Sequence, residues 1–167
     1  LPVDVTPVIE DVAYTFRFSL RLQRPIVRRS RQPLIYQVRR ERFDAFLCEA
    51  AVVAGAELQD GSRVTGLDVD GRGITAQTAN GPVRAAVVIG ADGVLGTTAQ
   101  SVGRFRRRQL LSAWESEVAA CEQQLGPWRG EVAVDLGLTK GGYGWVFPKA
   151  DRLSVGVGGM LRANPPL

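Results

Sequence analysis

Three aromatic residues at alternate positions form the most distinctive chemical pattern in the sequence. Tyr143, Trp145 and Phe147 would project from one face of a β-strand, because successive side chains alternate between faces. Gly156 and Gly158 alternate in the segment that follows. Glycine weakens a strand unless a bulge forms or another group approaches the backbone closely. The pattern predicts a wall of rings beside an apolar ligand; the alternative is a hairpin whose rings simply fill a core.

The loop between these two segments decides which residues face each other. A four-residue loop, Lys149 to Arg152, pairs Trp145 with Gly156 and Tyr143 with Gly158. A five-residue loop would instead place valines opposite the rings. We expect the four-residue loop, with the glycines leaving volume for a ligand.

A glycine-rich stretch, "VVIGADGVLG", is the second candidate for chemistry. Gly90, Gly93 and Gly96 follow an apolar run, and such a loop can hold a pyrophosphate at a helix N-terminus. However, Asp92 would place a carboxylate where the phosphates must lie. No acidic residue closes a second strand about 20 residues later, where a ribose partner is expected. The spacing alone therefore does not establish a dinucleotide loop.

Scarce residue types narrow the chemistry further. The sequence has no histidine, which excludes a His-bearing zinc site, a Ser-His-Asp triad and a histidine general base. Cys48 and Cys121 lie too far apart for a metal-ligand pattern and are too few for a disulfide framework. We expect no metal site, and no residue stands out as a catalytic acid or base.

Arginine is abundant, and the net charge is +4. Nine arginines lie between Arg17 and Arg42, and four more lie in residues 104–108. A basic patch can bind nucleic acid or an anionic membrane, or can simply be a solvated face in a protein from an arginine-preferring genome. No nucleic-acid motif accompanies the charge, so we expect no nucleic-acid partner. No apolar run approaches the roughly 18 residues of a membrane span, and no signal peptide is recognisable. We expect a cytoplasmic location, with peripheral membrane contact through the arginines left open.

The hydrophobic pattern predicts the elements that must position these residues. Residues 13–22 and 33–38 read as strands, and residues 40–55 as a helix that ends at Gly55. One face of this helix is expected to be buried, with Phe43, Phe46, Leu47, Ala50, Ala51 and Ala54. Asp-Gly and Asn-Gly pairs at ten-residue spacing predict an antiparallel meander within residues 56–92, which ends in the apolar run 85–90. Residues 85–90 form an unalternating apolar run that predicts a strand buried on both faces. The pattern of residues 110–125 fits either a helix or a strand, and residues 130–137 are predicted to form a strand.

Taken together, three motifs resemble the geranylgeranyl reductase family of FAD-dependent oxidoreductases, over about Val38 to Gly159. The first is V-x-R-x-x-F-D-x-x-L, met by Val38, Arg40, Phe43, Asp44 and Leu47. The second is G-A-D-G at residues 90–93. The third and most specific is Y-x-W-x-F-P, seven residues and G-x-G, met by Tyr143, Trp145, Phe147, Pro148, Gly156 and Gly158.

The resemblance implies a flavoprotein that reduces carbon–carbon double bonds in polyprenyl chains, with an electron donor that the sequence does not identify. Arg40 matches the family arginine that reaches the FAD phosphate region, and its alternative role is a salt bridge with Glu41 or Asp44. Val64 falls where relatives contact the adenine, and Asp92 and Gly93 lie near the cofactor. The residues of the third motif would line the cavity for an isoprenoid substrate. A flavin carries out hydride chemistry itself, so no catalytic residue is named.

The resemblance also has gaps. The family begins with a G-x-G-x-x-G loop and has a later G-D segment under the flavin, and this sequence has neither, so we expect a central fragment of a longer protein. Gly96, Thr98 and Ala99 replace the S-x-V-R that usually follows G-A-D-G. An aromatic hydroxylase or halogenase, and a non-catalytic fragment that binds apolar ligands or nothing, remain alternatives.

The expected fold class is α+β. Residues 1–110 would form part of an FAD-binding domain, with a helix and an antiparallel meander. Residues 111–167 would form part of an antiparallel substrate-binding domain. By the resemblance, residues 113–118 are a strand that crosses between the two.

Overall fold

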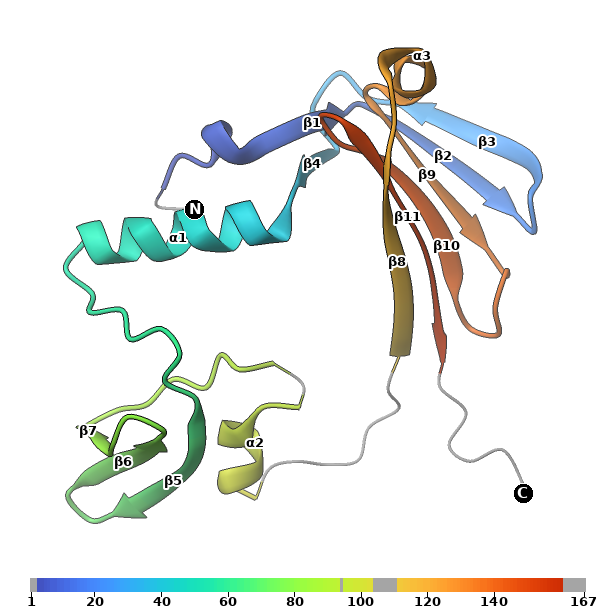
Figure 1. The fold of residues 1–167 in the computed structure, drawn as a ribbon. Coiled ribbons are helices and arrows are strands. Elements are labelled where there is room, and N and C mark those ends of the chain that lie inside the picture. Colours follow the sequence, from blue (N-terminus) through green and yellow to red (C-terminus); the bar gives the residue numbers. More distant parts are fainter. Residues whose placement is uncertain (1–2, 94, 104–110, 161–167) are drawn as a thin grey trace. The chain divides into compact units, whose positions relative to one another are not determined.

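A six-stranded sheet, with strand order β3-β2-β9-β10-β11-β8, carries the predicted substrate residues (Figure 1). Its strands are β2 (Thr15–Leu20), β3 (Gln23–Arg29), β8 (Leu111–Ala119), β9 (Glu131–Leu136), β10 (Tyr143–Pro148) and β11 (Arg152–Met160). The computed structural model describes residues 3–93, 95–103 and 111–160, so the arginine run at residues 104–108 lies outside the described residues. The strand predicted at residues 113–118 and the hairpin after it are confirmed.

The strands of residues 111–160 pair antiparallel, as expected, but the sheet also contains one parallel pairing that was not predicted. Strands β2 and β9 are parallel, with Phe18 beside Val134, whereas the other neighbours are antiparallel. Parallel neighbours need a long connection, and more than one hundred residues separate these two strands in the sequence. Hairpin β2–β3 therefore belongs to the same sheet as the carboxy-terminal strands.

The amino-terminal segment adds a second small sheet and the main helix. Strand β1 (Ile9–Ala13) follows the short 3-10 helix η1 (Thr6–Val8) and pairs with β4 (Ile35–Val38), which leads into α1 (Arg40–Val53). The strand predicted at residues 33–38 and the helix are confirmed, whereas β1 was not predicted. Gly55 ends the helix region with a φ of +100°. The apolar face is only partly covered: Phe43, Phe46 and Leu47 are half-buried, and α1 has no fully buried residue.

Residues 57–108 form a separate compact unit around a three-stranded meander. It consists of β5 (Val64–Asp70), β6 (Gly73–Thr78) and β7 (Val83–Ala85), with the short helix α2 (Thr97–Ser101). The predicted antiparallel meander is confirmed, with Asp70-Gly71 and Asn80-Gly81 at its two turns. Asp60-Gly61 precedes β5 and does not connect two strands.

The buried strand predicted at residues 85–90 is wrong. Only Ala85 belongs to a strand, and Val87 and Ile89 are 74% and 86% exposed. A strand buried on both faces needs neighbours on each side. Within the described residues, no strand pairs with residues 86–90, so the apolar run stays irregular.

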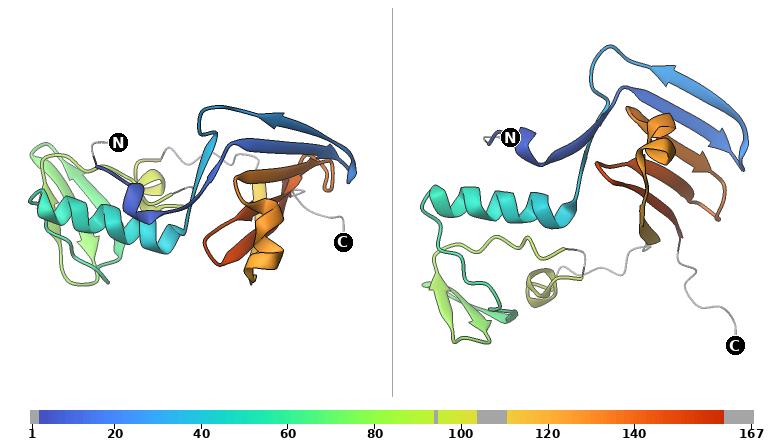
Figure 2. Two further views of the ribbon diagram at one scale, coloured as in Figure 1. Left: turned by 90° about the horizontal axis from the view of Figure 1, so that it is seen from above. Right: turned by 45° about the horizontal axis from the view of Figure 1, so that its top comes forward.

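The other compact unit contains residues 1–56 and 109–167. The short helices α3 (Glu122–Leu125) and η2 (Gly126–Trp128) lie at one end of its sheet, as Figures 1 and 2 show, and its fully buried apolar residues include Ala13, Leu125 and Val132. These units do not coincide with the expected boundary at residue 110, because β2 and β3 join the carboxy-terminal strands. The functional division into FAD-binding and substrate-binding parts stays a prediction. Within the described ranges, no helix is long and apolar enough to cross a membrane.

Candidate ring wall and cofactor-binding residues

The three predicted rings lie in a row along β10. The Tyr143 and Trp145 ring centroids are 5.8 Å apart, and those of Trp145 and Phe147 are 6.3 Å apart. The predicted hairpin register is confirmed: Tyr143 pairs with Gly158, and Trp145 pairs with Gly156. The alternation of the strand therefore produces a continuous aromatic surface, which we call the ring row.

The space above Gly156 holds a side chain of the protein, which corrects the expectation that this glycine leaves volume for a ligand. A methyl group on Gly156 would overlap the six-membered ring of Trp145. The indole therefore lies flat across β11 at this position, and only glycine permits that close approach. At Gly158, a methyl group would come within 3.3 Å of the Ala113 side chain. Both glycines thus shape the aromatic surface and do not open a cavity beneath it.

The same face of the sheet extends beyond β10. Residues directly opposite each other on neighbouring strands share a face, so Phe18, Val134 and Trp145 lie side by side across the sheet. Phe16 and Phe18 stack with centroids 4.1 Å apart. The sequence signalled these phenylalanines only as an alternating strand and did not indicate that they would join the ring row.

Pro148 does not lie with the rings. It is fully buried and, by the alternation of β10, points to the opposite face of the sheet. The motif therefore contributes three ring residues to one face and a core residue to the other. On the side of β8, Glu115 pairs with Gly156 and ends the apolar surface with an exposed carboxylate.

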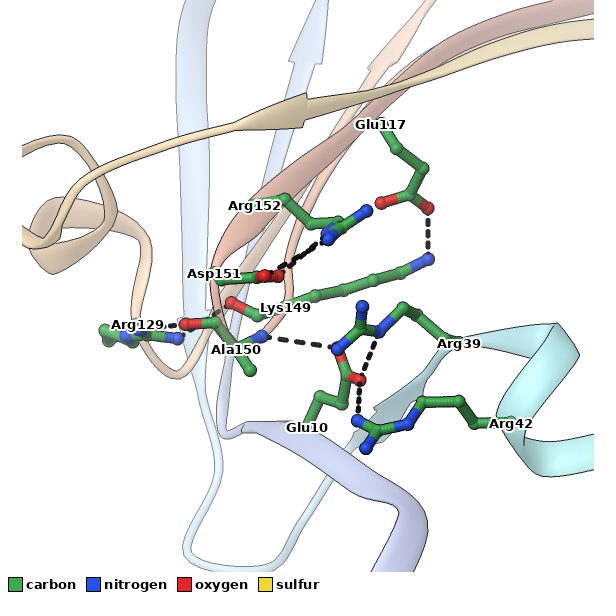
Figure 3. Close-up of polar contacts among 9 residues, drawn as sticks. All are labelled: Glu10, Arg39, Arg42, Glu117, Arg129, Lys149, Ala150, Asp151 and Arg152. Carbon is green, nitrogen blue, oxygen red and sulfur yellow. Dashed lines mark hydrogen bonds and ion pairs between the residues drawn. The ribbon is translucent and has the colours of Figure 1, made fainter. Parts of the chain in front are cut away.

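The β10–β11 turn is held by polar contacts from several distant segments (Figure 3). Arg129 Nη1 and Nη2 donate hydrogen bonds of 2.8 Å to the carbonyls of Lys149 and Ala150. Lys149 forms an ion pair with Glu117 of β8. Glu10 Oε2 accepts a 3.4 Å hydrogen bond from the Ala150 amide. These contacts fix the turn, and thereby the register that places Trp145 over Gly156.

Glu10 also forms hydrogen bonds that connect the start of α1 to this turn. Its side chain is 5% exposed and accepts hydrogen bonds from Arg39 at 2.5 Å and Arg42 at 3.1 Å. Burial raises the pKa of Glu10, but the bonds from Arg39, Arg42 and Ala150 outweigh burial, so the pKa lies below its ordinary value. The sequence did not reveal this cluster, because its members are far apart in the chain.

Arg40, the predicted phosphate ligand, occupies the first residue of α1. Its side chain is 80% exposed and forms a 3.0 Å ion pair with Asp44, one turn further along. The hydrogen bond to Asp44 raises the pKa of the guanidinium, which stays charged in any case. The alternative role suggested by the sequence, a salt bridge with Asp44, is therefore present. An exposed pair of this kind contributes little stability, so it leaves the guanidinium available to an anion.

Val64 and Asp92 lie together in the other unit. Both line a groove of about 480 Å³ between the meander and residues 88–98. Asp92 accepts hydrogen bonds from the side chain and backbone amide of Thr98, at 2.5 Å and 3.0 Å, and these bonds lower the pKa of Asp92. Gly93 follows with a φ of +79°, a backbone conformation that favours glycine.

The remaining glycines of this loop are required by close packing. A methyl group on Gly90 would overlap the Thr98 side chain, and one on Gly96 would overlap the Asp92 carboxylate. The G-x-x-G-x-x-G spacing therefore serves a tight loop in which Asp92 caps the first turn of α2. The carboxylate occupies this loop, as the sequence objection to a pyrophosphate there anticipated.

Comparison with known proteins identifies the family. Residues 5–133 match the FAD binding domain family. The chain belongs to this family. FAD, the cofactor predicted from the motifs, is the cofactor for which the family is named.

Curated relatives confirm the resemblance to geranylgeranyl reductases. Digeranylgeranylglycerophospholipid reductase 1 of Methanopyrus kandleri is 33% identical over 137 residues, which cover 74% of this chain and 35% of the relative. The digeranylgeranylglycerophospholipid reductase of Methanosarcina acetivorans is 34% identical over 135 residues, which cover 74% of this chain and 32% of the relative. The chain thus spans about a third of the length of these relatives.

The fold is similar to that of known flavoproteins. One similar structure is the crystal structure of the halogenase PltM L111Y mutant in complex with FAD. The match has a TM-score of 0.70 and covers 95% of this chain and 37% of the halogenase chain. Sequence identity in this comparison is 16%, so the match establishes the fold alone. It supports the expected α+β class, in which strands predominate.

Proposed function

We propose that this chain is the central part of an FAD-dependent reductase that saturates carbon–carbon double bonds in geranylgeranyl or longer polyprenyl chains. The observation that carries the proposal is the ring row, in which Tyr143, Trp145 and Phe147 form one aromatic surface whose geometry depends on Gly156. The names of the curated relatives support the same reaction.

The physical fit lies between this surface and an isoprenoid chain. A polyprenyl chain offers only methyl groups, methylenes and the π-faces of its double bonds, so it gains binding free energy mainly by burial against apolar area. Each aromatic side chain can bury about 150–250 Å². The stacked Phe16 and Phe18 extend the apolar face across β9. A row of rings suits an extended chain better than a small polar aromatic substrate, which would need specific hydrogen-bond partners.

Four residues are proposed to contact the cofactor. We propose that Arg40 binds an FAD phosphate, that the backbone of Val64 contacts the adenine, and that Asp92 and Gly93 contact the cofactor. The exposed guanidinium of Arg40 and the groove shared by Val64 and Asp92 fit these roles. A carboxylate has about four acceptor sites, so Asp92 can accept a further bond beside those from Thr98. Bound FAD would supply the hydride, and the protein would position the chain and exclude water.

The proposed substrate also suggests a location. Because the isoprenoid chains of a phospholipid lie in a bilayer, we propose that the protein works in the cytoplasm, at the membrane surface. The electron donor could be a nicotinamide or a ferredoxin, and the reaction requires one of them.

Binding of a geranylgeranyl lipid to the full-length protein tests the role of the ring row. Trp145→Ala should weaken binding by a few kcal/mol at most, since neighbouring side chains relax into part of the lost volume. Val155→Ala is the matched control, because Val155 is 38% exposed on the opposite face of β11. If the wild type and Trp145→Ala bind the lipid with equal affinity, the ring row is not part of the substrate site.

A further inference from the structure

The turn between β2 and β3 is unusual in its backbone. Arg21 and Leu22 have φ values of +52° and +58°, and they are the non-glycine residues with positive φ in the described part of the chain. Hairpin turns of this kind usually contain Asn-Gly or Asp-Gly, because bulky side chains disfavour positive φ. Such strain persists only where the surrounding structure enforces it, and it often marks a functional segment.

A buried carboxylate enforces this turn. Asp135 of β9 is 7% exposed, and its Oδ2 accepts hydrogen bonds from the Leu22 amide at 2.6 Å and the Ser19 hydroxyl at 2.5 Å. The Arg21 amide donates to the Leu136 carbonyl at 3.0 Å. The turn is thus held in a fixed conformation by contacts from β9.

This fixed turn presents leucine to solvent. Leu22 is 79% exposed, Leu20 is 61% exposed and Ile26 is 56% exposed. The β9–β10 loop lies beside it, because a methyl group on Gly137 would come within 3.3 Å of the Leu20 side chain. Figure 2 shows the turn and the loop at the same end of the sheet. We call Leu20, Leu22 and Ile26 the apolar tip.

Positive charge surrounds the apolar tip. Arg21, Arg24, Arg28 and Arg29 are all exposed, and the sequence has no acidic residue from Val12 to Arg40. None of these four arginines forms an ion pair with a carboxylate of the described residues. Arg17, opposite Val27 in the hairpin, is paired with Glu131 at 2.5 Å. Arg21 in the turn and Arg24 at the start of β3 are thus the exposed, unpaired arginines nearest the tip among the described residues, whereas Arg28 and Arg29 lie at the far end of β3.

We propose that the apolar tip inserts into the headgroup region of an anionic membrane while the surrounding arginines bind lipid headgroups. Peripheral membrane binding combines buried apolar area with attraction between basic side chains and anionic lipids. The arginines closest to the tip, Arg21 and Arg24, contribute most, because the attraction decays within about 10 Å at moderate salt.

Two other partners fit these observations less well. A second copy could pair along the edge strand β3, but Pro25 removes one amide from that edge, and like-charged arginines would face each other across a two-fold axis. A single-stranded nucleic acid would be recognised by stacking on exposed rings. The apolar tip is wholly aliphatic, and the exposed rings nearest to it, Phe18 and Tyr143, belong to the ring-row face of the sheet.

The position of the tip links membrane binding to the ring row. Leu20 pairs with Leu136, and Leu136 pairs with Tyr143, so one row of residues joins the turn to the first ring. Trp145 and Phe147 follow along β10 away from that end. An isoprenoid chain leaving the bilayer at the tip would therefore meet Tyr143 first. This last step rests on the proposed function, whereas membrane binding itself does not.

Vesicle sedimentation with the purified chain tests the inference, using phosphatidylcholine vesicles with and without about one third phosphatidylglycerol. We expect binding to the anionic vesicles that weakens as salt is raised.

The double variant Leu20→Ser, Leu22→Ser should bind at least about ten-fold more weakly. Arg21→Gln with Arg24→Gln should lose roughly five-fold per arginine. Val69→Ser, at a valine of β5 that is 67% exposed, and Arg72→Gln are the matched controls and should bind like the wild type.

Several outcomes would overturn the inference. These are no binding by the wild type, equal binding by all variants, and a self-association that the leucine substitutions abolish. Tighter binding to a single-stranded oligonucleotide than to vesicles, unaffected by the leucine substitutions, would assign the arginines to nucleic acid. Circular dichroism melts of each variant establish that it is folded. The assay contains neither flavin nor isoprenoid, so failure of the proposed reductase activity would leave its result unchanged.

Discussion

Trp145 and Gly156 show how a single cross-strand pair sets the shape of the ring row. The indole lies over the glycine, in space that any other residue at position 156 would take. The φ of Gly156 lies outside the left-handed region, so the requirement for glycine here comes from packing and not from the backbone. A substitution at this position therefore reports directly on the position of the ring.

Gly156→Ala should destabilise the fold by about 1–3 kcal/mol, because its methyl group displaces the indole. Urea denaturation followed by tryptophan fluorescence measures both the loss and the changed environment of the ring. Gly66→Ala is the control, because a methyl group at that strand glycine would meet no atom within 4 Å. If the two substitutions cost the same, the indole does not occupy the space over Gly156.

Arg39 and Arg40 are neighbours with different predicted roles. In the full-length protein, Arg40→Ala should weaken FAD binding by about 1.5–3 kcal/mol, the usual contribution of a charge-assisted hydrogen bond. Arg39→Ala should mainly destabilise the fold, since Arg39 is 20% exposed and bonded to Glu10. Titration of the apoprotein with FAD, together with thermal melts, separates the two effects. Equal losses of FAD affinity would show that Arg40 is not the specific ligand.

At the scale of elements, the β10–β11 hairpin depends on β1, β8 and the start of α1. Glu10 is the central residue, since it contacts Arg39, Arg42 and the turn amide of Ala150. Its folded-state pKa lies below 4.5, the ordinary value. The carboxylate therefore contributes stability above about pH 4.5, and this contribution is lost as the pH falls through the lowered pKa.

Glu10→Gln should consequently lower the stability of the fold at neutral pH. Below about pH 4.5 the variant should lose less stability than the wild type does as the pH falls. Melting temperatures measured from neutral to acidic pH test this. Asp151→Asn is the control: the hydrogen bond from Arg152 lowers the pKa of Asp151 to about 2, but Asp151 is exposed and solvent screens the pair, so it contributes little. If the melting temperature of Glu10→Gln falls with acid as steeply as that of the wild type, Glu10 does not have the role assigned to it.

Local patterns in the sequence predicted most elements but not their long-range partners. The length of the Lys149–Arg152 loop fixed the register of Trp145 and Gly156, and apolar periodicity located α1. The pairing of β2 with β9 could not be predicted, because contacts such as Ser19 with Asp135 join residues more than one hundred positions apart. The strand predicted at residues 85–90 failed for a related reason, since burial depends on neighbours that its own sequence does not specify.

At the scale of the whole molecule, the predicted cofactor residues are divided between the two compact units. Arg40 belongs to the unit with the six-stranded sheet, whereas Val64, Asp92 and Gly93 belong to the meander unit. The sequence contains no G-x-G-x-x-G loop, which the resemblance assigns to the FAD pyrophosphate. FAD binding is therefore expected to need more than the residues of this chain.

The 167-residue chain alone should not hold FAD at micromolar affinity. The chain can be mixed with excess FAD and desalted, and the flavin absorbance of the protein fraction then measures retention. A colourless fraction is the expected result. A stoichiometric yellow protein would mean that Arg40, Val64, Asp92 and their neighbours form a complete site.

Single-turnover reduction by the full-length protein tests the proposed function most directly. The FAD enzyme is reduced with dithionite without oxygen and mixed with a geranylgeranyl lipid; flavin absorbance and product mass are then followed. The account predicts flavin reoxidation, a gain of two hydrogens for each double bond reduced, and a loss of chain affinity in Trp145→Ala but not in Val155→Ala. A flavin that stays reduced with every isoprenoid, or that turns over only with oxygen and a small aromatic compound, would contradict it.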